Sequence, residues 1–375
     1  MNITITILLI IAIFLAEISQ KNKTYNREGK SVYRKYENFY MLPFVLSFCI
    51  LAGVCFFCKS GTDMSVYIKF YSAWTVSDFS DWKFEIGDKI LFIILHRFIK
   101  NPYVGIGLVK ILSIALVYRA IYLVRDKIKI GLAVIAYIVL LYIFNFHLIR
   151  MMIAIGLVFL ALSYEITGKR AKCMVLLITA LFFHYSSCLV LLTYFSYLAC
   201  SKRFSMGKIL VILMILTFSY SNAIQIVDGL TQVRFFSKYT TYETVTASGS
   251  GILQIVLFIP IAIILFKGYR TEKETAFYQL AFFCGIMTFF TGSLGYVYTV
   301  TGRLRYYFYF FFVIYGAATP LKMNDIVLRC GKRKINLSTG LIYVWLILNT
   351  YIYFIVGNAF VSNGVRQYIT IFTLS

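Results

Sequence analysis

Apolar runs of bilayer-spanning length recur along this chain and restrict its fold more than any other feature. A run of about 17 to 25 apolar residues is long enough to cross the hydrocarbon layer as a helix. Such runs occupy residues 2–19, 40–58, 104–124, 131–147, 149–166, 209–227, 251–266, 275–294, 303–320 and 338–358. Because 60% of the 375 residues are hydrophobic and only 14% are charged, a soluble domain of this size is excluded. The sequence therefore predicts an all-α integral membrane protein.

The apolar run at residues 173–199 does not fit a single crossing. GKRAK precedes it and SKRF follows it, so a single crossing would place one basic cluster on the outer side. We therefore predict two short helices hinged at His184. This threading gives about twelve transmembrane helices in one polytopic domain over residues 1–375, with both termini outside.

Basic residues occupy every second loop of this threading. Six loops predicted to be cytoplasmic hold 24 of the 37 Lys and Arg residues, as the positive-inside rule requires. These loops are residues 20–39, 119–130, 167–172, 201–208, 267–274 and 321–337. Membrane orientation thus explains the formal net charge of +22, and nucleic-acid binding is set aside.

Two long segments, residues 59–103 and 228–250, are predicted to lie outside, where loops can carry function. Arg150, Arg303 and Arg305 stand at the outer starts of long apolar helices, where a cation costs free energy unless an anion accompanies it. A guanidinium can bind two phosphate oxygens at once, and a helix N-terminus adds amide donors. We predict that these arginines bind a diphosphate. The alternative is that each side chain snorkels to the lipid headgroups.

The first outer segment combines acidic and aromatic side chains. Asp63 and Tyr67 share a helical face, and Trp74, Trp82 and Glu85 follow in the same segment. Carboxylates accept hydrogen bonds from sugar hydroxyls, and flat rings cover the C–H faces of pyranoses. These residues predict a sugar-binding surface. A solvated loop without a ligand is the alternative.

Two further sets of side chains are candidates for the same chemistry. Tyr306 and Tyr307 follow Arg303 by three and four residues, which predicts a shared face and sugar contacts, or else an interfacial aromatic belt. His184 lies between two apolar half-helices. We predict that it acts as a catalytic base or phosphate ligand; the alternative is a buried histidine whose hydrogen bonds are satisfied within the protein. The eight cysteines lie mostly within apolar runs, and we predict no metal site and no cofactor.

Several stretches between residues 40 and 320 share a recognisable order of motifs. They are SGTDMSVYIKFY, FEIGDK, LIRMMIAIGLVFLALSYEITGKRAK, ALFFHYSSCLVLL and GRLRYYFYFFFVIYG. In this order they resemble the EpsG/Wzy family of bacterial polysaccharide polymerases, which make O-antigen, capsule or exopolysaccharide. The tail after residue 340 matches none of these motifs, and the span boundaries at residues 86–103 depart from the family pattern.

The resemblance implies a nucleotide-independent glycosyltransferase of GT-C-like architecture, at the outer face of the bacterial cytoplasmic (inner) membrane. Such enzymes transfer a growing chain from undecaprenyl diphosphate onto a new lipid-linked oligosaccharide repeat unit. The family pattern carries over to Asp63, Tyr67, Glu85, Arg150, His184, Arg303 and Tyr307. In this reaction the arginines would stabilise the leaving diphosphate, and Asp63, Glu85 or His184 would act as base.

The partners implied are the lipid-linked oligosaccharide, the lipid bilayer and, as a candidate, a chain-length regulator protein. An O-antigen-type ligase performs the same chemistry on another acceptor and is the alternative function. A flippase or other transporter predicts inverted repeats and polar residues near the midplane; the sequence shows no such repeat, and its charges outside the cytoplasmic loops collect at the outer ends of the spans. A membrane acyltransferase would need a catalytic histidine on the cytoplasmic side, whereas His184 is threaded outward.

Overall fold

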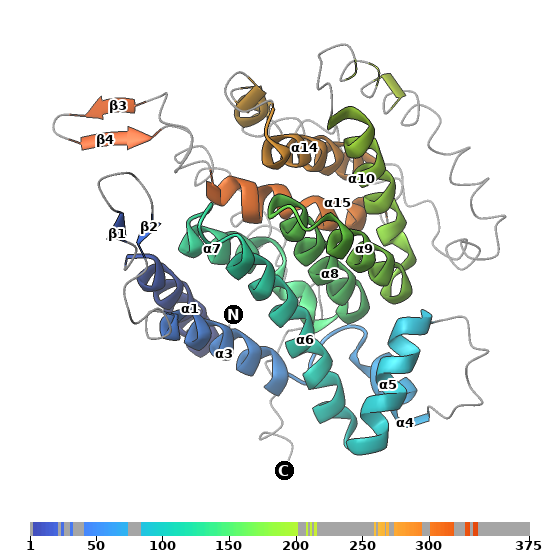
Figure 1. Cartoon of the computed structure of the whole chain (residues 1–375). Coiled ribbons are helices and arrows are strands. Elements are labelled where there is room, and N and C mark those ends of the chain that lie inside the picture. Colours follow the sequence, from blue (N-terminus) through green and yellow to red (C-terminus); the bar gives the residue numbers. More distant parts are fainter. Residues whose placement is uncertain are drawn as a thin grey trace. The chain divides into compact units, whose positions relative to one another are not determined.

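Helices account for most of the computed structural model (Figure 1). It describes residues 3–21, 24–25, 31–32, 41–73, 84–201, 274–294, 301–318, 327–330 and 333–336, and single positions or short stretches between 208 and 269. The chain divides into two compact units, residues 1–187 with 312–375 and residues 188–311. The predicted helical class is thus confirmed.

The first unit contains most of the described helices. They are α1 (Ile3–Lys21), α3 (Leu42–Phe57), α4 (Met64–Ala73), α5 (Ile86–Phe98), α6 (Pro102–Leu123), α7 (Ile130–Leu140), α8 (Ile149–Ile166) and α9 (Arg170–Phe183). Two 3₁₀ helices join them, η2 (Tyr142–Phe146) and η3 (Tyr185–Ser187). Two short antiparallel strand pairs, which the sequence did not predict, are β1 (Thr24–Tyr25) with β2 (Ser31–Val32) and β3 (Val327–Cys330) with β4 (Arg333–Asn336).

Among the described residues, three helices are long and apolar enough to cross a bilayer. They are α6, α8 and α14 (Ala276–Leu294), and shorter apolar helices accompany them at residues 5–19, 42–57, 130–140 and 185–201. The predicted runs 149–166 and 275–294 coincide with α8 and α14 to within one residue. These helices agree with the predicted membrane protein. The predicted spans at 209–227, 251–266 and 338–358 lie largely or wholly outside the described residues.

The predicted span 131–147 is divided in the structure. Its α-helical part, α7, ends at Leu140, and the 3₁₀ helix η2 continues the apolar run. Asn145 in η2 accepts a hydrogen bond from Ser113 Oγ of α6 at 2.5 Å and donates to the Tyr137 hydroxyl at 3.0 Å. These buried contacts satisfy polar groups that lipid cannot hydrogen-bond.

Close packing around α8 holds the first unit together. All but two of its side chains are buried, and it packs against α6 and α9. At Gly156 a Cβ atom would meet Leu116 Cβ at 2.8 Å, so glycine permits the close approach of α8 to α6. On α6, Asn101 caps the helix by accepting from the Tyr103 and Val104 amides, and Pro102 occupies the first turn.

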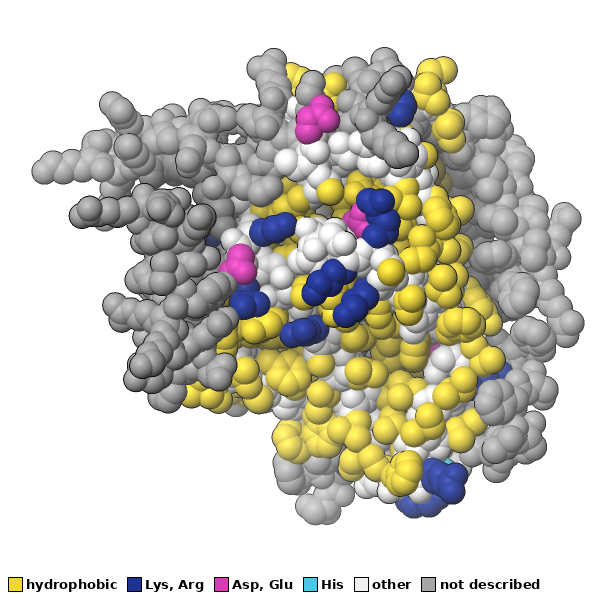
Figure 2. All heavy atoms as spheres, in the orientation of Figure 1, with side chains coloured by type: hydrophobic (Ala, Val, Ile, Leu, Met, Phe, Trp, Pro, Cys, Tyr) yellow, Lys and Arg dark blue, Asp and Glu magenta, His cyan; other side chains and the backbone are white. Residues whose placement is uncertain are grey.

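The outer helices of this unit expose apolar side chains. α1 and α3 lie side by side (Figure 1). Exposed large hydrophobic residues on α1, α3 and α9 are Ile7, Ile10, Ile11, Phe14, Leu42, Val45, Leu46, Val175, Ile178 and Phe182. Figure 2 shows hydrophobic side chains over much of the visible surface. An apolar exterior of this extent suits contact with lipid.

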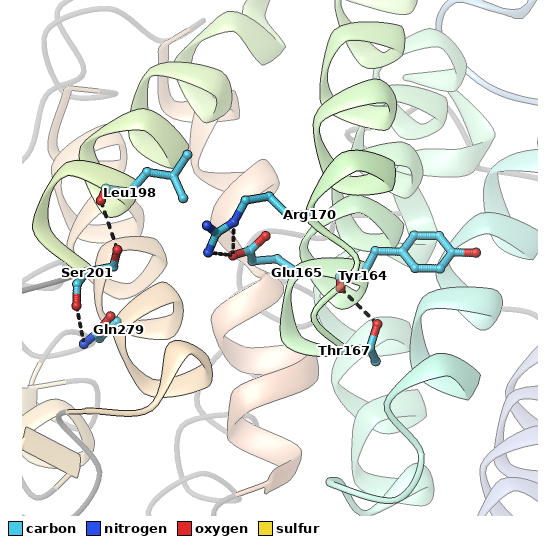
Figure 3. Close-up of polar contacts among 7 residues, drawn as sticks. All are labelled: Tyr164, Glu165, Thr167, Arg170, Leu198, Ser201 and Gln279. Carbon is cyan, nitrogen blue, oxygen red and sulfur yellow. Dashed lines mark hydrogen bonds and ion pairs between the residues drawn. The ribbon is translucent and has the colours of Figure 1, made fainter.

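The second unit contains α10 (Cys188–Ser201), α14, the 3₁₀ helix η5 (Thr301–Leu304) and the short helix α15 (Arg305–Phe308). The π-helix η6 (Phe311–Tyr315) follows α15 along the chain. Within the unit, α14 packs against α10, η5 and α15. The Gln279 amide of α14 donates to the Ser201 carbonyl at the end of α10, at 3.4 Å (Figure 3).

The predicted break at His184 is confirmed. α9 ends at Phe183, His184 takes an extended backbone conformation, and α10 begins at Cys188 after η3. α9 has 14 residues and is about 21 Å long, shorter than the hydrocarbon layer. The return of the chain to the side on which it entered stays a prediction.

Cysteine labelling tests that return. In a cysteine-free background, we expect Ser201→Cys to be unreactive toward an impermeant thiol reagent in intact cells and reactive after permeabilisation. Lys100→Cys, at an exposed position of the predicted outer segment, is the control that reacts in intact cells. Labelling of Ser201→Cys from outside would show that this region crosses the membrane.

Candidate active site

Arg150 stands in the first turn of α8, where the helix dipole opposes a positive charge. An anion beside it is therefore favourable. Glu85 supplies one, because its Oε2 accepts a hydrogen bond from Arg150 Nη1 at 2.5 Å in an ion pair. Arg150 lies in α8 and Glu85 directly precedes α5, 65 positions away in the chain. The fold thus joins two residues of the predicted site.

Burial of the two partners differs strongly. The Glu85 side chain is 1% exposed, whereas the Arg150 side chain is 25% exposed. Glu85 precedes the first residue of α5 and does not cap that helix with its side chain. Its carboxylate is directed to Arg150 instead. The pair therefore presents an anchored guanidinium, and not a carboxylate, at the surface.

Aromatic side chains complete the setting of Arg150. Its Cζ lies over the Phe84 ring, 4.4 Å from the ring centroid, at cation–π distance. Tyr67 of α4 packs edge-on against Phe84 with centroids 6.0 Å apart, and its phenol lies near enough to Arg150 for the two groups to interact electrostatically. Contacts from two chain segments, residues 84–85 and α4, therefore fix the direction of one guanidinium.

Asp63 and Tyr67 lie one helical turn apart, as predicted. The Tyr67 amide donates to the Asp63 carbonyl oxygen at 3.1 Å, and the half-exposed Asp63 precedes α4. Burial raises the pKa of the Tyr67 phenol above its usual value, while the positive charge of Arg150 opposes that rise. Tyr67 is 3% exposed, so it is a neutral polar group within the cluster.

Asp88 belongs to the same cluster, although the sequence did not single it out. It lies one turn after Glu85 on α5 and is 1% exposed. Its negative charge acts on both Tyr67 and Arg150. Asp88 follows Glu85 by three residues, which places both on one helix face. This spacing is the sequence feature that could have identified Asp88.

Gly87 explains how α5 reaches this position. A Cβ atom there would meet the Phe182 carbonyl oxygen at 2.7 Å, so only glycine permits this contact with the end of α9. His184, two residues after Phe182, is half-exposed, and its Nδ1 is hydrogen-bonded to Ser186 Oγ at 2.6 Å. Its neighbour Tyr185 experiences the charges of Glu85 and Asp88.

In the second unit, the predicted long helix beginning at Arg303 is replaced by a 3₁₀ helix followed by the short helix α15. Arg303 is exposed in the 3₁₀ helix η5, and Arg305 begins α15 with its Cζ 5.5 Å from the centroid of the Tyr306 ring. Tyr306 and Tyr307 are buried, at 6% and 0% exposure. Their sugar contacts stay a prediction. Trp74 and Trp82 lie outside the described residues, as does the outer segment 228–250.

A buried lysine is the second residue that the sequence did not single out. Lys110 lies within α6 at 0% exposure, and its Nζ donates to the Cys58 carbonyl at the end of α3, at 2.9 Å. A cation is favourable at a helix C-terminus. This contact fixes the point at which the chain leaves α3 toward Asp63. The sequence feature that could have identified Lys110 is a charged residue inside a predicted span.

In the part of the chain that the structure describes, no group of three or more His, Cys, Asp or Glu side chains could hold a metal ion. The site there consists of an arginine, buried carboxylates and aromatic rings.

The apolar helices and this anchored arginine define a membrane protein with a candidate site for an anionic ligand. Residues 38–370 match the model of the EpsG family, so the chain belongs to the EpsG family. Membership associates it with polysaccharide biosynthesis and a polymerase-like glycosyltransferase function. Searches of the curated proteins and of the solved structures found no match.

Proposed function

We propose that this protein joins oligosaccharide repeat units carried on undecaprenyl diphosphate, at the outer face of the bacterial inner membrane. The observation that carries the proposal is Arg150, anchored by Glu85 and Tyr67 with a quarter of its side chain exposed. Together with the amides of the α8 N-terminus, it offers donors for phosphate oxygens. The proposal includes about twelve spans in a GT-C-like architecture.

In the proposed reaction, an acceptor hydroxyl oxygen bonds to the anomeric carbon of the donor sugar. The bond from that carbon to the phosphate oxygen breaks, and undecaprenyl diphosphate leaves with the bonding electrons. Arg150 stabilises the developing negative charge, and a base takes the hydroxyl proton. Arg303 and Arg305 are further proposed diphosphate ligands, to be tested by substitution.

Glu85 has a positioning role in this proposal, because its buried carboxylate is held by Arg150. Asp63 and His184 are both half-exposed and are the proposed alternatives for the base. Removing the base is expected to lower the rate by about a hundredfold or more. The rate that survives in Asp63→Asn and in His184→Gln identifies which residue takes the proton.

Reconstitution tests the function itself. Purified protein in liposomes, given only undecaprenyl-diphosphate-linked repeats, is expected to lengthen them without nucleotide sugar or ATP. Gel electrophoresis of the labelled glycolipid reads out chain length. Transfer of finished chains to another lipid without lengthening would indicate a ligase, and movement of unlengthened units across the bilayer would indicate a flippase; either result replaces the proposal.

A further inference from the structure

The far end of α8 carries a second cluster of charge. α8 has 18 residues and is about 27 Å long, close to the thickness of the hydrocarbon layer. Arg150 marks one end, and a set of cations that we call the basic collar marks the other. The collar consists of Arg125, Lys127, Lys129, Lys169, Arg170 and Lys172. A helix of this length places the collar at headgroup level.

A helix-ending motif builds the collar from local sequence. The Gly168 amide donates to the Glu165 carbonyl and the Lys169 amide to the Tyr164 carbonyl, both at 2.9 Å. This is the Schellman pattern, which requires a left-handed residue, and Gly168 has φ +77°. Thr167 Oγ1 also donates to the Tyr164 carbonyl, at 2.9 Å (Figure 3). The chain therefore reverses at Gly168 and returns its lysines toward Tyr164.

Two lysines of the collar flank one aromatic ring. The Nζ atoms of Lys172 and Lys169 lie 5.5 Å and 6.0 Å from the centroid of the Tyr164 ring. Lys169 and Lys172 are exposed, and the Tyr164 side chain is half-buried. Cation–π contacts at this distance hold ammonium groups in place without neutralising them. The two positive charges are therefore directed together and remain accessible.

Neighbouring contacts fix two further members of the collar, Arg170 and Lys127. Arg170 donates from Nε and Nη2 to Glu165 Oε1 at 3.2 Å and 3.0 Å, on the side opposite the Tyr164 ring (Figure 3). Lys127 Nζ donates to the Ile166 carbonyl at 3.0 Å, which joins the loop after α6 to the end of α8. Figure 2 shows Lys and Arg side chains gathered where Figure 1 draws α7, α8 and α9.

We infer that the basic collar is a binding site for the phosphodiester of an anionic glycerophospholipid, with Lys169 and Lys172 as its ligands. Among the described residues, the collar has six cations, and the acids near it are Asp126, Glu165 and Glu17, whose side chain lies beside Gly131. We choose a lipid as the occupant because α9, which begins directly after Lys169 and contains Lys172, exposes apolar side chains that can contact acyl chains next to the headgroup. The site is separate from the Arg150 cluster and does not depend on the proposed reaction.

Native mass spectrometry of the full-length protein tests the site. We expect phosphatidylglycerol to bind more tightly than phosphatidylcholine, and Lys169→Gln with Lys172→Gln to weaken phosphatidylglycerol binding about thirtyfold. The matched control is the double variant Lys59→Gln with Lys100→Gln, which removes two positive charges away from the collar. Lys59 resembles the collar lysines, because its Nζ lies 4.4 Å from the centroid of the Tyr103 ring. This control is expected to bind the lipid as the unaltered protein does.

Ring substitution separates a built site from general charge. Tyr164→Leu keeps every charge but removes the ring, and it is expected to weaken phosphatidylglycerol binding severalfold, while Tyr164→Phe leaves binding unchanged. Equal loss in the control double variant, or no loss in Tyr164→Leu, would overturn the site. Displacement of the lipid by an equal concentration of inorganic phosphate would assign the collar to a soluble anion instead.

Discussion

Replacing Arg150 with alanine is expected to lower polymer synthesis by a hundredfold or more, to below detection in cells. Removing one preorganised donor to a developing anion typically costs about two to three powers of ten in rate. Arg150→Lys keeps the charge but loses the planar fork, so one ammonium must serve Glu85, Tyr67 and a phosphate. We expect shorter chains in this variant, measured by gel electrophoresis of the extracted polysaccharide.

A double substitution separates the chemical loss from a folding defect. Arg150→Ala alone leaves the Glu85 carboxylate buried without its cation, which also destabilises the protein. Adding Glu85→Gln removes that charge and is expected to restore protein abundance, but not polymer. Polymer at the normal level in Arg150→Ala, with normal protein abundance, would end the assignment of Arg150 to the diphosphate.

The extent of α8 could be predicted from the sequence, whereas that of α7 could not. An apolar run bounded by Arg150 and Gly168 has only one continuous helical solution. The run at 131–147 is equally apolar, but its hydropathy does not distinguish an α-helix from a 3₁₀ helix. Asn145 decides the outcome through hydrogen bonds to Ser113 and Tyr137, which are distant in sequence or on another helix.

The candidate site was predictable as a set of residue types, but not as a set of pairs. Arg150 was identifiable because a cation at the start of an apolar helix needs an explanation. Its pairing with Glu85 was not, since five acids in one outer segment were equivalent in sequence. Tertiary contacts made the choice, because Gly87 lets the start of α5 approach the end of α9 and Glu85 meets Arg150 of α8. Lys110 was identifiable as a charge inside a predicted span, but its partner was not, because a backbone carbonyl leaves no sequence pattern.

Replacing Glu85 with alanine is expected to destabilise the protein by about 3 kcal/mol and to lower polymer synthesis strongly. The partly buried Arg150 would lose its ion-pair partner and with it a fixed direction. Thermal unfolding of the purified protein measures the first effect, and in vitro chain lengthening measures the second. Lys69→Ala on the exposed side of α4 is a control that should leave both unchanged.

Glu85→Gln distinguishes a positioning group from a catalytic base. Glutamine retains an oxygen that accepts from Arg150 Nη1, so a positioning role predicts partial activity, with a dependence on pH like that of the unaltered protein. A base must take a proton, and the glutamine amide cannot do so near neutral pH. If Glu85 is the base, Glu85→Gln is therefore expected to be as inactive as Glu85→Ala. Because Glu85 is 1% exposed and paired, we expect the first result. Complete loss of lengthening in a stably folded Glu85→Gln protein would return Glu85 to the role of base and remove that role from Asp63 and His184.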